Sequence, residues 1–528
     1  MQPITTDATA PLVQDYLRAT AARLPDKVAL VCQKRRVTFR EMDDASDRLA
    51  GYLASKGVVR GDRVLVFGDN TVETAIAFWA VLKCDAIVSI VSPLTRAEKL
   101  RFLLQDCRAR ALVTDSQLAD VFEAAVNTQT AFSTPHLTVT VVSHVTDPDR
   151  LYRVPGGTTW EDAQAANQPP PPRRNIDVDL ASITYTSGTT GEPKGVMMTH
   201  QAMMAATTSI CAYLGTNEDD VVASALPLAF SYGLYQLIKT VRLGARLVLE
   251  RSFAFPAQVL RTMAEEGATA FPGVPTIFAS LAEMKSLHTF DLSRLRYITN
   301  AASALSEKHV KFLRSAFPQA RVYSMYGQTE CVRASYVPPD ILDRKPGSMG
   351  IAIPNTELWI IDEHGQRVGP GVPGELVVRG STLMRGYWER PEKTAARLRP
   401  GPVPGELVLH TGDRCTMDEE GHFHFVARMD DIIKTRGEKV APKEVENTIT
   451  GIPGVKECAV IGVPDPLLGQ AVKAFVVLEQ GASLHPKQIQ HACLARLESY
   501  MVPKVVEIVA SLPKTASGKI KKLDLVPT

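Results

Sequence analysis

The sequence predicts an α/β protein with a large N-terminal domain, made of two βα-layered subdomains and a barrel-like subdomain, and a small α+β C-terminal domain. Three observations lead to this prediction. Short β-rich runs alternate with helical patterns from residue 28 onward, which is typical of βαβ units with a parallel sheet. From about residue 345, Gly-rich turns separate short strands, as in an antiparallel barrel. The mixed pattern returns after residue 431 and indicates the small domain.

The first two α/β stretches are separated by prolines. Pro169 to Pro172 can form neither a helix nor a central strand, so we expect a surface connector there, and the second stretch begins at residue 179. Apolar runs predict strands at 28–33, 64–69, 86–91, 245–250 and 295–303. Amphipathic or apolar segments predict helices at 41–57, 74–84 and 258–267.

The remaining elements follow from the same patterns. In the barrel-like part, strands are expected at 356–365, 374–380 and 405–413. In the C-terminal domain, strands are expected at 457–465 and 473–481 and helices at 444–454 and 485–499. No fixed-period repeat of the solenoid kind is found.

Charge and hydropathy exclude several classes of protein. The net charge is +2 and the mean hydropathy is −0.03, so we expect no nucleic-acid partner and no strong attraction to an anionic membrane. The apolar runs fall short of the roughly 20 residues that a membrane span requires. No basic segment followed by an apolar one opens the chain, which predicts a cytoplasmic protein. The eight cysteines are scattered without C-x-x-C spacing and are expected to be buried.

A loop rich in glycine and hydroxyl groups is the most informative motif. The string TYTSGTTGEPKGV runs from Thr184 to Val196 and follows an apolar, strand-like run. Its glycines permit positive φ, and its successive backbone N–H groups can wrap a phosphate chain. It is not a Walker A motif, because Glu192 and Pro193 separate Gly191 from Lys194.

With this loop, the sequence resembles the adenylate-forming superfamily of acyl-CoA synthetases, peptide-synthetase adenylation domains and luciferases. The resemblance covers nearly the whole chain. The other matching strings, in the order of the family, are YGQTE at Tyr326 to Glu330, GELVVRG at Gly374 to Gly380, TGD at Thr411 to Asp413, RMDDIIKTRGEKVAPKEVE at Arg428 to Glu446, and PKTASGKIKK at Pro513 to Lys522.

The resemblance implies an ATP-dependent ligase that forms an acyl-AMP and then an acyl thioester, with Mg²⁺ as a cofactor. The implied catalytic residues are Lys519, Thr329 and Glu330, with Glu330 as the ligand of the metal ion, which prefers hard oxygen donors. The implied nucleotide-binding residues are Thr186, Ser187, Gly188, Thr189, Thr190, Gly191, Lys194, Ser303, Tyr326, Gly327, Asp413 and Arg428. Asp413 would accept hydrogen bonds from the ribose hydroxyls, which suits an ionised carboxylate.

Attack of a carboxylate on the α-phosphate builds up negative charge, which fixed cations and N–H donors stabilise. Lys519 is the candidate cation in this sequence. The resemblance further implies domain boundaries at 1–427 and 431–528, with a hinge at 428–430 that lets the C-terminal domain rotate as a mobile lid. Asp430 would be the hinge residue, and Lys434, Gly437 and Glu438 would form the loop that faces the site during thioester formation.

The acyl pocket is expected to include Phe230, Ser231, Tyr232, Tyr235, Ala302 and Met325. Ser231 stands where amino-acid-activating relatives carry an Asp that pairs the substrate ammonium, so a free α-amino acid is disfavoured. Phe230 replaces the His of many CoA ligases. Met325 stands where the family often has Gly or Ala, and its bulk predicts a small or medium acid, aromatic or aliphatic.

Several alternatives remain open at this point. CoA is favoured as the thiol, but a carrier-protein phosphopantetheine fits the same chemistry. A less common possibility is transfer of the activated group to an amine, or activation of another oxyanion. A protein that kept the fold and lost the chemistry is disfavoured, because Lys519, Asp413, Arg428 and Glu330 are all present. The chain is expected to be a monomer or a homodimer.

Overall fold

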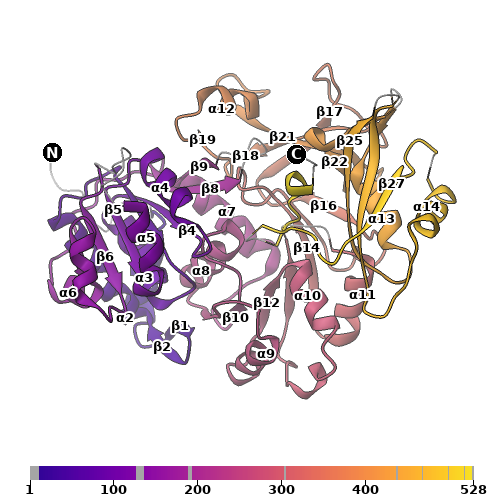
Figure 1. The fold of residues 1–528 in the computed structure, drawn as a ribbon. Coiled ribbons are helices and arrows are strands. Elements are labelled where there is room, and N and C mark those ends of the chain that lie inside the picture. The colour runs from indigo at the N-terminus through magenta and orange to yellow at the C-terminus, as the bar shows by residue number, and fades with distance from the viewer. Residues whose placement is uncertain are drawn as a thin grey trace. The chain divides into compact units, whose positions relative to one another are not determined.

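The computed structural model describes residues 11–126, 136–187, 193–301, 305–435, 438–465, 468–497, 499–515 and 518–525 (Figure 1). The chain divides into two compact units. The first comprises Met1–Arg344, Ala352–Thr356 and Gly380–Leu398, and the second comprises Lys345–Ile351, Glu357–Arg379 and Arg399–Thr528.

The first unit contains two sheets. The strand order of the first sheet is β19 (Gly386–Tyr387), β9 (Pro193–Thr199), β8 (Leu180–Ser187), β4 (Ile87–Val91), β3 (Arg63–Phe67), β5 (Ala111–Asp115), β6 (Val139–Ser143) and β7 (Gly157–Thr159). This sheet is parallel from β8 to β7, while β9 pairs antiparallel with β8 and β19 pairs antiparallel with β9.

Two groups of helices pack around this sheet. The first group is α2 (Phe39–Ser55), α3 (Val72–Lys83) and α6 (Trp160–Ala165), and the second is α4 (Ala97–Asp106) and α5 (Ala119–Val126). Thr38 begins α2 with a capping box that pairs it with Glu41. Every residue of α3 is buried, as expected for a helix that is apolar all round. Its Lys83 pairs with Asp43 and Asp47 of α2, at 2.6 Å each.

The second sheet of this unit joins the N-terminal hairpin to later strands. Its order is β2 (Arg35–Thr38), β1 (Val28–Cys32), β11 (Arg246–Leu249), β10 (Val221–Ser224), β12 (Ala270–Gly273), β13 (Tyr297–Asn300), β14 (Arg321–Tyr326) and β15 (Ser335–Val337). The other helices of the unit are α1 (Asp15–Arg23), α7 (His200–Leu214), α8 (Ser231–Leu243), α9 (Pro256–Glu265), α10 (Pro275–Ala282), α11 (Glu307–Ala316) and α12 (Pro391–Arg397).

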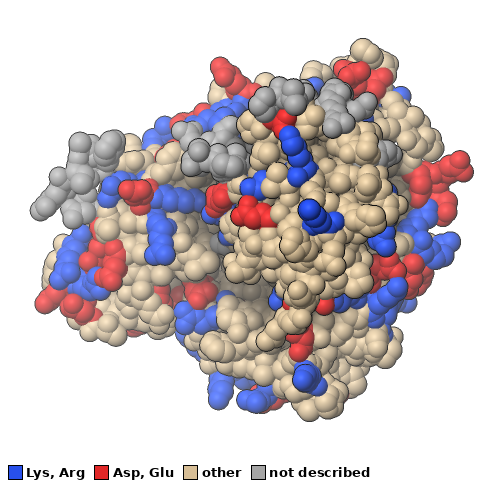
Figure 2. All heavy atoms as spheres, turned by 45° about the vertical axis from the view of Figure 1, so that its right-hand side comes forward, with Lys and Arg blue, Asp and Glu red and all other residues tan. Residues whose placement is uncertain are grey.

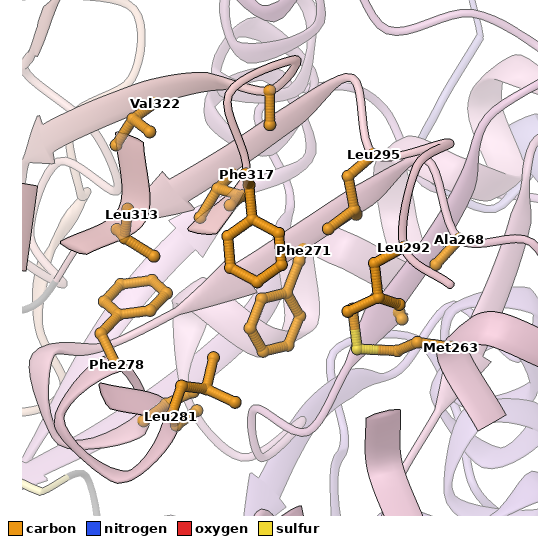
Figure 3. Packing of buried hydrophobic residues seen from close by; sticks show 14 of the residues in the cluster. Met263, Ala268, Phe271, Phe278, Leu281, Leu292, Leu295, Leu313, Phe317 and Val322 are labelled. Carbon is orange, nitrogen blue, oxygen red and sulfur yellow. The ribbon is translucent and has the colours of Figure 1, made fainter. Parts of the chain in front are cut away.

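An aromatic and aliphatic core fixes the second sheet against its helices. Phe271 of β12 packs edge-on against Phe278 of α10, with ring centroids 6.3 Å apart, and Leu313 of α11 joins the same cluster (Figure 3). Each of these side chains is at most 1% exposed, so their burial stabilises the sheet that carries β14.

The second unit also contains two sheets. One is antiparallel, in the order β17 (Thr356–Ile361), β18 (Gly374–Gly380), β21 (Leu407–Met417), β22 (Phe423–Arg428) and β16 (Ser348–Ala352), and β20 spans Leu398–Pro400. The other has the order β24 (Glu438–Val440), β23 (Ile433–Thr435), β26 (Gly469–Leu478) and β25 (Val455–Asp465), with β27 (Val505–Ile508) beside β26. Helices α13 (Pro442–Thr450) and α14 (Pro486–Leu494) complete its core.

The predicted fold class is confirmed, but the two α/β stretches on either side of the proline segment do not correspond to two separate sheets. The strand at 28–33 pairs with β11 in the second sheet, and the strand that begins at Leu180 pairs with β4 in the first. The proline segment therefore does not separate the two sheets. Local patterns define a strand and leave open which distant strand it pairs with.

Three further expectations concern the chain as a whole. All eight cysteines are buried, as predicted. Within the described residues, no helix is both long and apolar enough to span a membrane. Acidic and basic side chains are interspersed on the face in Figure 2, in keeping with the small net charge.

Candidate active site

The glycine-rich loop connects two strands of one hairpin. Thr186 of β8 lies opposite Lys194 of β9, and Ser187 lies opposite Pro193. In Figure 1, β8, β9 and β19 lie together, as their pairing requires. The two ends of the loop therefore lie side by side, where β8 ends and β9 begins. Gly188, Thr189, Thr190 and Gly191 lie outside the described residues.

Tyr387 of β19 links two predicted site residues that are far apart in sequence. The Nζ of Lys194 lies 5.6 Å from the centroid of the Tyr387 ring, as in a cation–π contact. The Tyr387 hydroxyl donates a 2.8 Å hydrogen bond to Oε1 of Glu330. The Glu330 carbonyl also accepts a hydrogen bond from the Met384 N–H. The structure therefore brings the loop lysine and the candidate metal ligand together around one ring.

The YGQTE motif begins at the end of β14. Tyr326 pairs with Ser335 of β15, and its hydroxyl accepts a hydrogen bond from Nε2 of Gln328 at 3.3 Å. A Cβ on Gly327 would lie 2.5 Å from the Val332 carbonyl oxygen, so the close return of the chain requires glycine there. Thr329 is half-buried in the turn that follows.

Two of the predicted acyl-pocket residues, Met325 and Tyr232, make contacts near the YGQTE motif. Met325 is 7% exposed, and its sulfur accepts a 2.9 Å hydrogen bond from the Tyr213 hydroxyl. The Tyr232 hydroxyl lies 2.9 Å from the Thr299 carbonyl oxygen, which ties α8 to β13. Tyr213 also stacks on Tyr336, with ring centroids 4.3 Å apart. These contacts form an aromatic wall beside Met325.

The other predicted pocket residues are placed as follows. Phe230 is the N-cap of α8 and Ser231 its first residue, and both are half-buried. Tyr235 is 4% exposed and lies near Tyr16. Ala302 and Ser303 lie outside the described residues.

The second unit carries the predicted ribose-binding pair. Asp413 of β21 lies opposite Arg428 of β22, and Nη1 of Arg428 donates a 2.7 Å hydrogen bond to Oδ1 of Asp413. The Asp413 side chain is 3% exposed, and its backbone N–H donates to Oγ1 of Thr411 at 3.1 Å. The Arg428 guanidinium thus fixes the orientation of this carboxylate through a charge-assisted hydrogen bond.

Lys519 lies on a short loop that is held at both ends. Its backbone N–H donates to Oγ1 of Thr515 at 3.1 Å, and its carbonyl accepts from the Thr515 N–H at 2.7 Å. Outside the loop, Lys514 pairs with Glu457 at 2.7 Å and Lys522 pairs with Glu446 at 2.7 Å. These flanking ion pairs fix the loop, and the Lys519 side chain is exposed at its end.

The predicted thioester-forming loop joins two paired strands. Lys434 lies on β23 and Glu438 on β24, with Thr435 opposite Glu438, while Gly437 lies outside the described residues. Asp430 lies in the single 3₁₀ turn Met429–Asp431 that joins β22 to this hairpin. Asp430, Lys434 and Glu438 therefore all lie in the short segment of chain that follows β22.

Comparison with known proteins decides the family. Residues 17–388 match the model of the AMP-binding enzyme family, and residues 444–519 match that of the AMP-binding enzyme C-terminal domain. This chain belongs to the AMP-binding enzyme family. It is accordingly a member of the adenylate-forming superfamily and an AMP-forming acid–thiol ligase.

Two relatives and one solved structure show how far the similarity extends. A long-chain-fatty-acid–CoA ligase of Bacillus subtilis (strain 168) is 32% identical over 537 residues, covering 97% of this chain and 94% of that protein. A feruloyl-CoA synthase of an Amycolatopsis species is 34% identical over 495 residues, covering 92% of each. The anthranilate CoA ligase AuaEII, solved with anthranoyl-AMP, is 29% identical with a TM-score of 0.87, covering 98% of this chain and 96% of that one.

Sequence reasoning missed Tyr387 and Tyr213, although both contact predicted site residues of this AMP-binding enzyme. Tyr387 follows Gly386 in a short strand that pairs with β9, and Tyr213 lies in the last turn of α7. Neither belongs to a motif with a recognisable spacing. Only the strand pairing and the helix packing bring them to the site.

Proposed function

We propose that this enzyme activates a small or medium aryl or aliphatic carboxylic acid and transfers the acyl group to CoA. The observation that supports this proposal best is the burial of Met325 under the Tyr213 hydroxyl, because a bulky side chain there shortens the space for an acyl chain. The relatives named above include a ligase of long-chain fatty acids and a synthase of feruloyl-CoA, so acid size varies within the family.

The reaction has two steps that balance without a protein nucleophile. A carboxylate oxygen attacks the α-phosphorus of ATP and pyrophosphate leaves, giving the acyl-AMP. The thiol sulfur then attacks the acyl carbonyl and AMP leaves, while the thiol proton passes to solvent. Lys194 and Lys519 supply positive charge for the phosphate groups in the first step, and the Asp413–Arg428 pair binds the ribose.

The residues present fit a Mg²⁺ ion bound together with ATP. Glu330 offers one carboxylate whose Oε1 is fixed by the Tyr387 hydroxyl, and Mg²⁺ is usually held by one or two carboxylates and by substrate phosphates. The ion would neutralise charge on the phosphates of ATP. Tyr387 orients Glu330 for that role.

The test is acid-dependent release of pyrophosphate from MgATP across benzoates, cinnamates, straight-chain acids and amino acids. We expect activity with small or medium acids, followed by a thioester with CoA. Side-by-side assays with a phosphopantetheinyl carrier protein distinguish the two thiols. Thioester formation with the carrier alone would contradict the assignment of CoA.

Met325→Gly tests the predicted limit on acid size. Removing the side chain opens room for roughly three to four methylenes, and each buried CH₂ contributes about 0.8 kcal/mol, or up to about fourfold in kcat/KM. The preferred chain length is therefore expected to increase across a homologous series of straight-chain acids. An unchanged optimum in a folded variant would show that Met325 does not limit the acyl chain.

A further inference from the structure

A buried arginine lies beside the predicted acyl wall. Arg333 is 5% exposed, although it stands only three residues after the YGQTE motif. The preceding residue, Val332, has a φ of 59°, which is strained for a β-branched side chain. The chain returns so closely that a Cβ on Gly327 would lie 2.8 Å from the Cα of Arg333. The motif loop thus holds Arg333 at a defined place.

Two tyrosine side chains lie near Arg333. Its guanidinium carbon lies 5.3 Å from the centroid of the Tyr232 ring, and its charge lowers the pKa of the nearby Tyr213 hydroxyl against the stronger, opposing effect of burial. Among the described residues, Arg333 forms no ion pair with a carboxylate, and its Nε has no hydrogen-bond partner. A guanidinium stays charged at physiological pH, so within the part of the chain that the structure describes this buried positive charge lacks a carboxylate to neutralise it.

A second cation reinforces the positive potential of this region. Lys239 of α8 is 1% exposed and donates a 3.5 Å hydrogen bond to the Tyr297 hydroxyl. Burial lowers the pKa of Lys239 to about 8, and the charge of Arg333 contributes to this shift. The carboxylate of Asp220 raises the pKa of Lys239, but Asp220 is already paired with Arg296 at 2.9 Å.

Arg333 is connected to two predicted acyl-pocket residues. Tyr232 lies under its guanidinium, and the hydroxyl of Tyr213, which is close enough to feel the charge of Arg333, donates to the sulfur of Met325. The reacting carboxylate must instead lie next to the phosphates of ATP. In the proposed function, the Lys194–Tyr387–Glu330 group binds those phosphates and their metal ion. An anion bound by Arg333 would therefore be a different part of the substrate.

We propose that Arg333 binds a second carboxylate, at the far end of the acyl substrate, so that the preferred acid is a dicarboxylic acid. This inference rests on the proposed function and specifies its substrate class. A guanidinium can bind a carboxylate through two parallel N–H···O bonds, which fixes the substrate and neutralises the buried charge. The ring of Tyr232 helps to hold the guanidinium in place.

The wild-type enzyme alone provides the first test. Straight-chain and aromatic dicarboxylic acids are compared with their monomethyl esters, which keep the reacting carboxylate and the length but lose the second charge. We expect kcat/KM for pyrophosphate release to favour the best diacid over its ester by about 10- to 100-fold, as for hydrogen bonds to a charged group. Equal or higher kcat/KM for the esters would overturn the inference and leave the proposed function intact. Release of no pyrophosphate with any acid would overturn both.

Variants of Arg333 provide the second test. In Arg333→Met, the ratio of diacid to ester kcat/KM is expected to fall to near 1, whereas Arg333→Lys should keep part of the preference because it retains the charge. Arg321→Met, at the exposed start of β14, is the matched control and should keep the wild-type ratio. Equal losses on both substrates in Arg333→Met would show a structural role and overturn the inference.

Discussion

At the residue scale, Tyr387 has two separable contacts, one with Lys194 through its ring and one with Glu330 through its hydroxyl. Neither contact could be predicted from the sequence, because the three residues lie on β19, on β9 and in the turn after β14. The roles of Lys194 and Glu330 rested on motifs, whereas the role of Tyr387 depends on strand pairing alone.

Tyr387→Phe removes the hydroxyl and keeps the ring. Because Glu330 then loses a hydrogen bond that fixes its carboxylate, we expect about a tenfold loss of kcat/KM in the adenylation step and a higher Mg²⁺ requirement. Pyrophosphate release measured against Mg²⁺ concentration checks both effects. Tyr387→Leu also removes the ring beneath Lys194, so it should lower kcat/KM for adenylation further than Tyr387→Phe does. Wild-type behaviour of the Phe variant would contradict the positioning role.

Because Lys239 is buried, we expect the free energy of unfolding to depend on pH in an unusual way. Burial lowers its pKa to about 8 from 10.5, against the opposing effects of Cys211 and Asp220. Between these values the unfolded chain binds a proton that the folded chain has released, so this residue's contribution to stability rises with pH. Below pH 8 both states are protonated, and the burial cost is felt in full.

Lys239→Met removes that cost. We expect the variant to be more stable than the wild type by about 2 kcal/mol at pH 7, with the difference shrinking as the pH rises toward 10.5. Urea unfolding of both proteins across this pH range is the measurement. A difference that stays constant with pH would show that the Lys239 charge is not the cause.

At the element scale, most individual helices and strands could be predicted from periodicity, but their pairing could not. The strand at Val28–Cys32 pairs with Arg246–Leu249, which is more than two hundred residues away, and no local pattern records that partner. The same holds for the second α/β stretch, whose first strand joins the first sheet. Burial of Arg333 likewise depends on the strained return of the chain at Val332.

The loop that carries Lys519 is an element whose ends are fixed while its side chain is exposed. Lys519→Ala is expected to lower the adenylation rate by about 100-fold or more and to spare thioester formation from supplied acyl-AMP, because the charge is needed only while phosphate charge develops. Lys521→Ala is a matched control two residues away, since Lys521 pairs at 3.5 Å with Asp524. Single-turnover assays of each half-reaction check this, and equal losses in both would refute the assignment.

At the scale of the whole molecule, one chain must catalyse two different steps in sequence, adenylation and thioester formation. The Lys194–Tyr387–Glu330 group lies in the first unit, whereas Asp413, Arg428 and Lys519 lie in the second. Adenylation needs a cation near the phosphates, and thioester formation needs access for a thiol. The predicted hinge at 428–430 would let the residues after it change position between the two steps.

Asp430→Pro tests the hinge, because proline fixes φ near −65°. Asp430 lies in a 3₁₀ turn, whose φ values proline can adopt, so the variant should retain the present backbone and lose access to others. Adenylation, measured as pyrophosphate release, is expected to survive better than thioester formation from supplied acyl-AMP. Asp430→Ala removes the carboxylate but keeps the backbone free, and it should retain both steps. If Asp430→Pro completes the full reaction at the wild-type rate, rotation about this residue is not part of the cycle, and the change of position must arise elsewhere in the connection between β22 and β23.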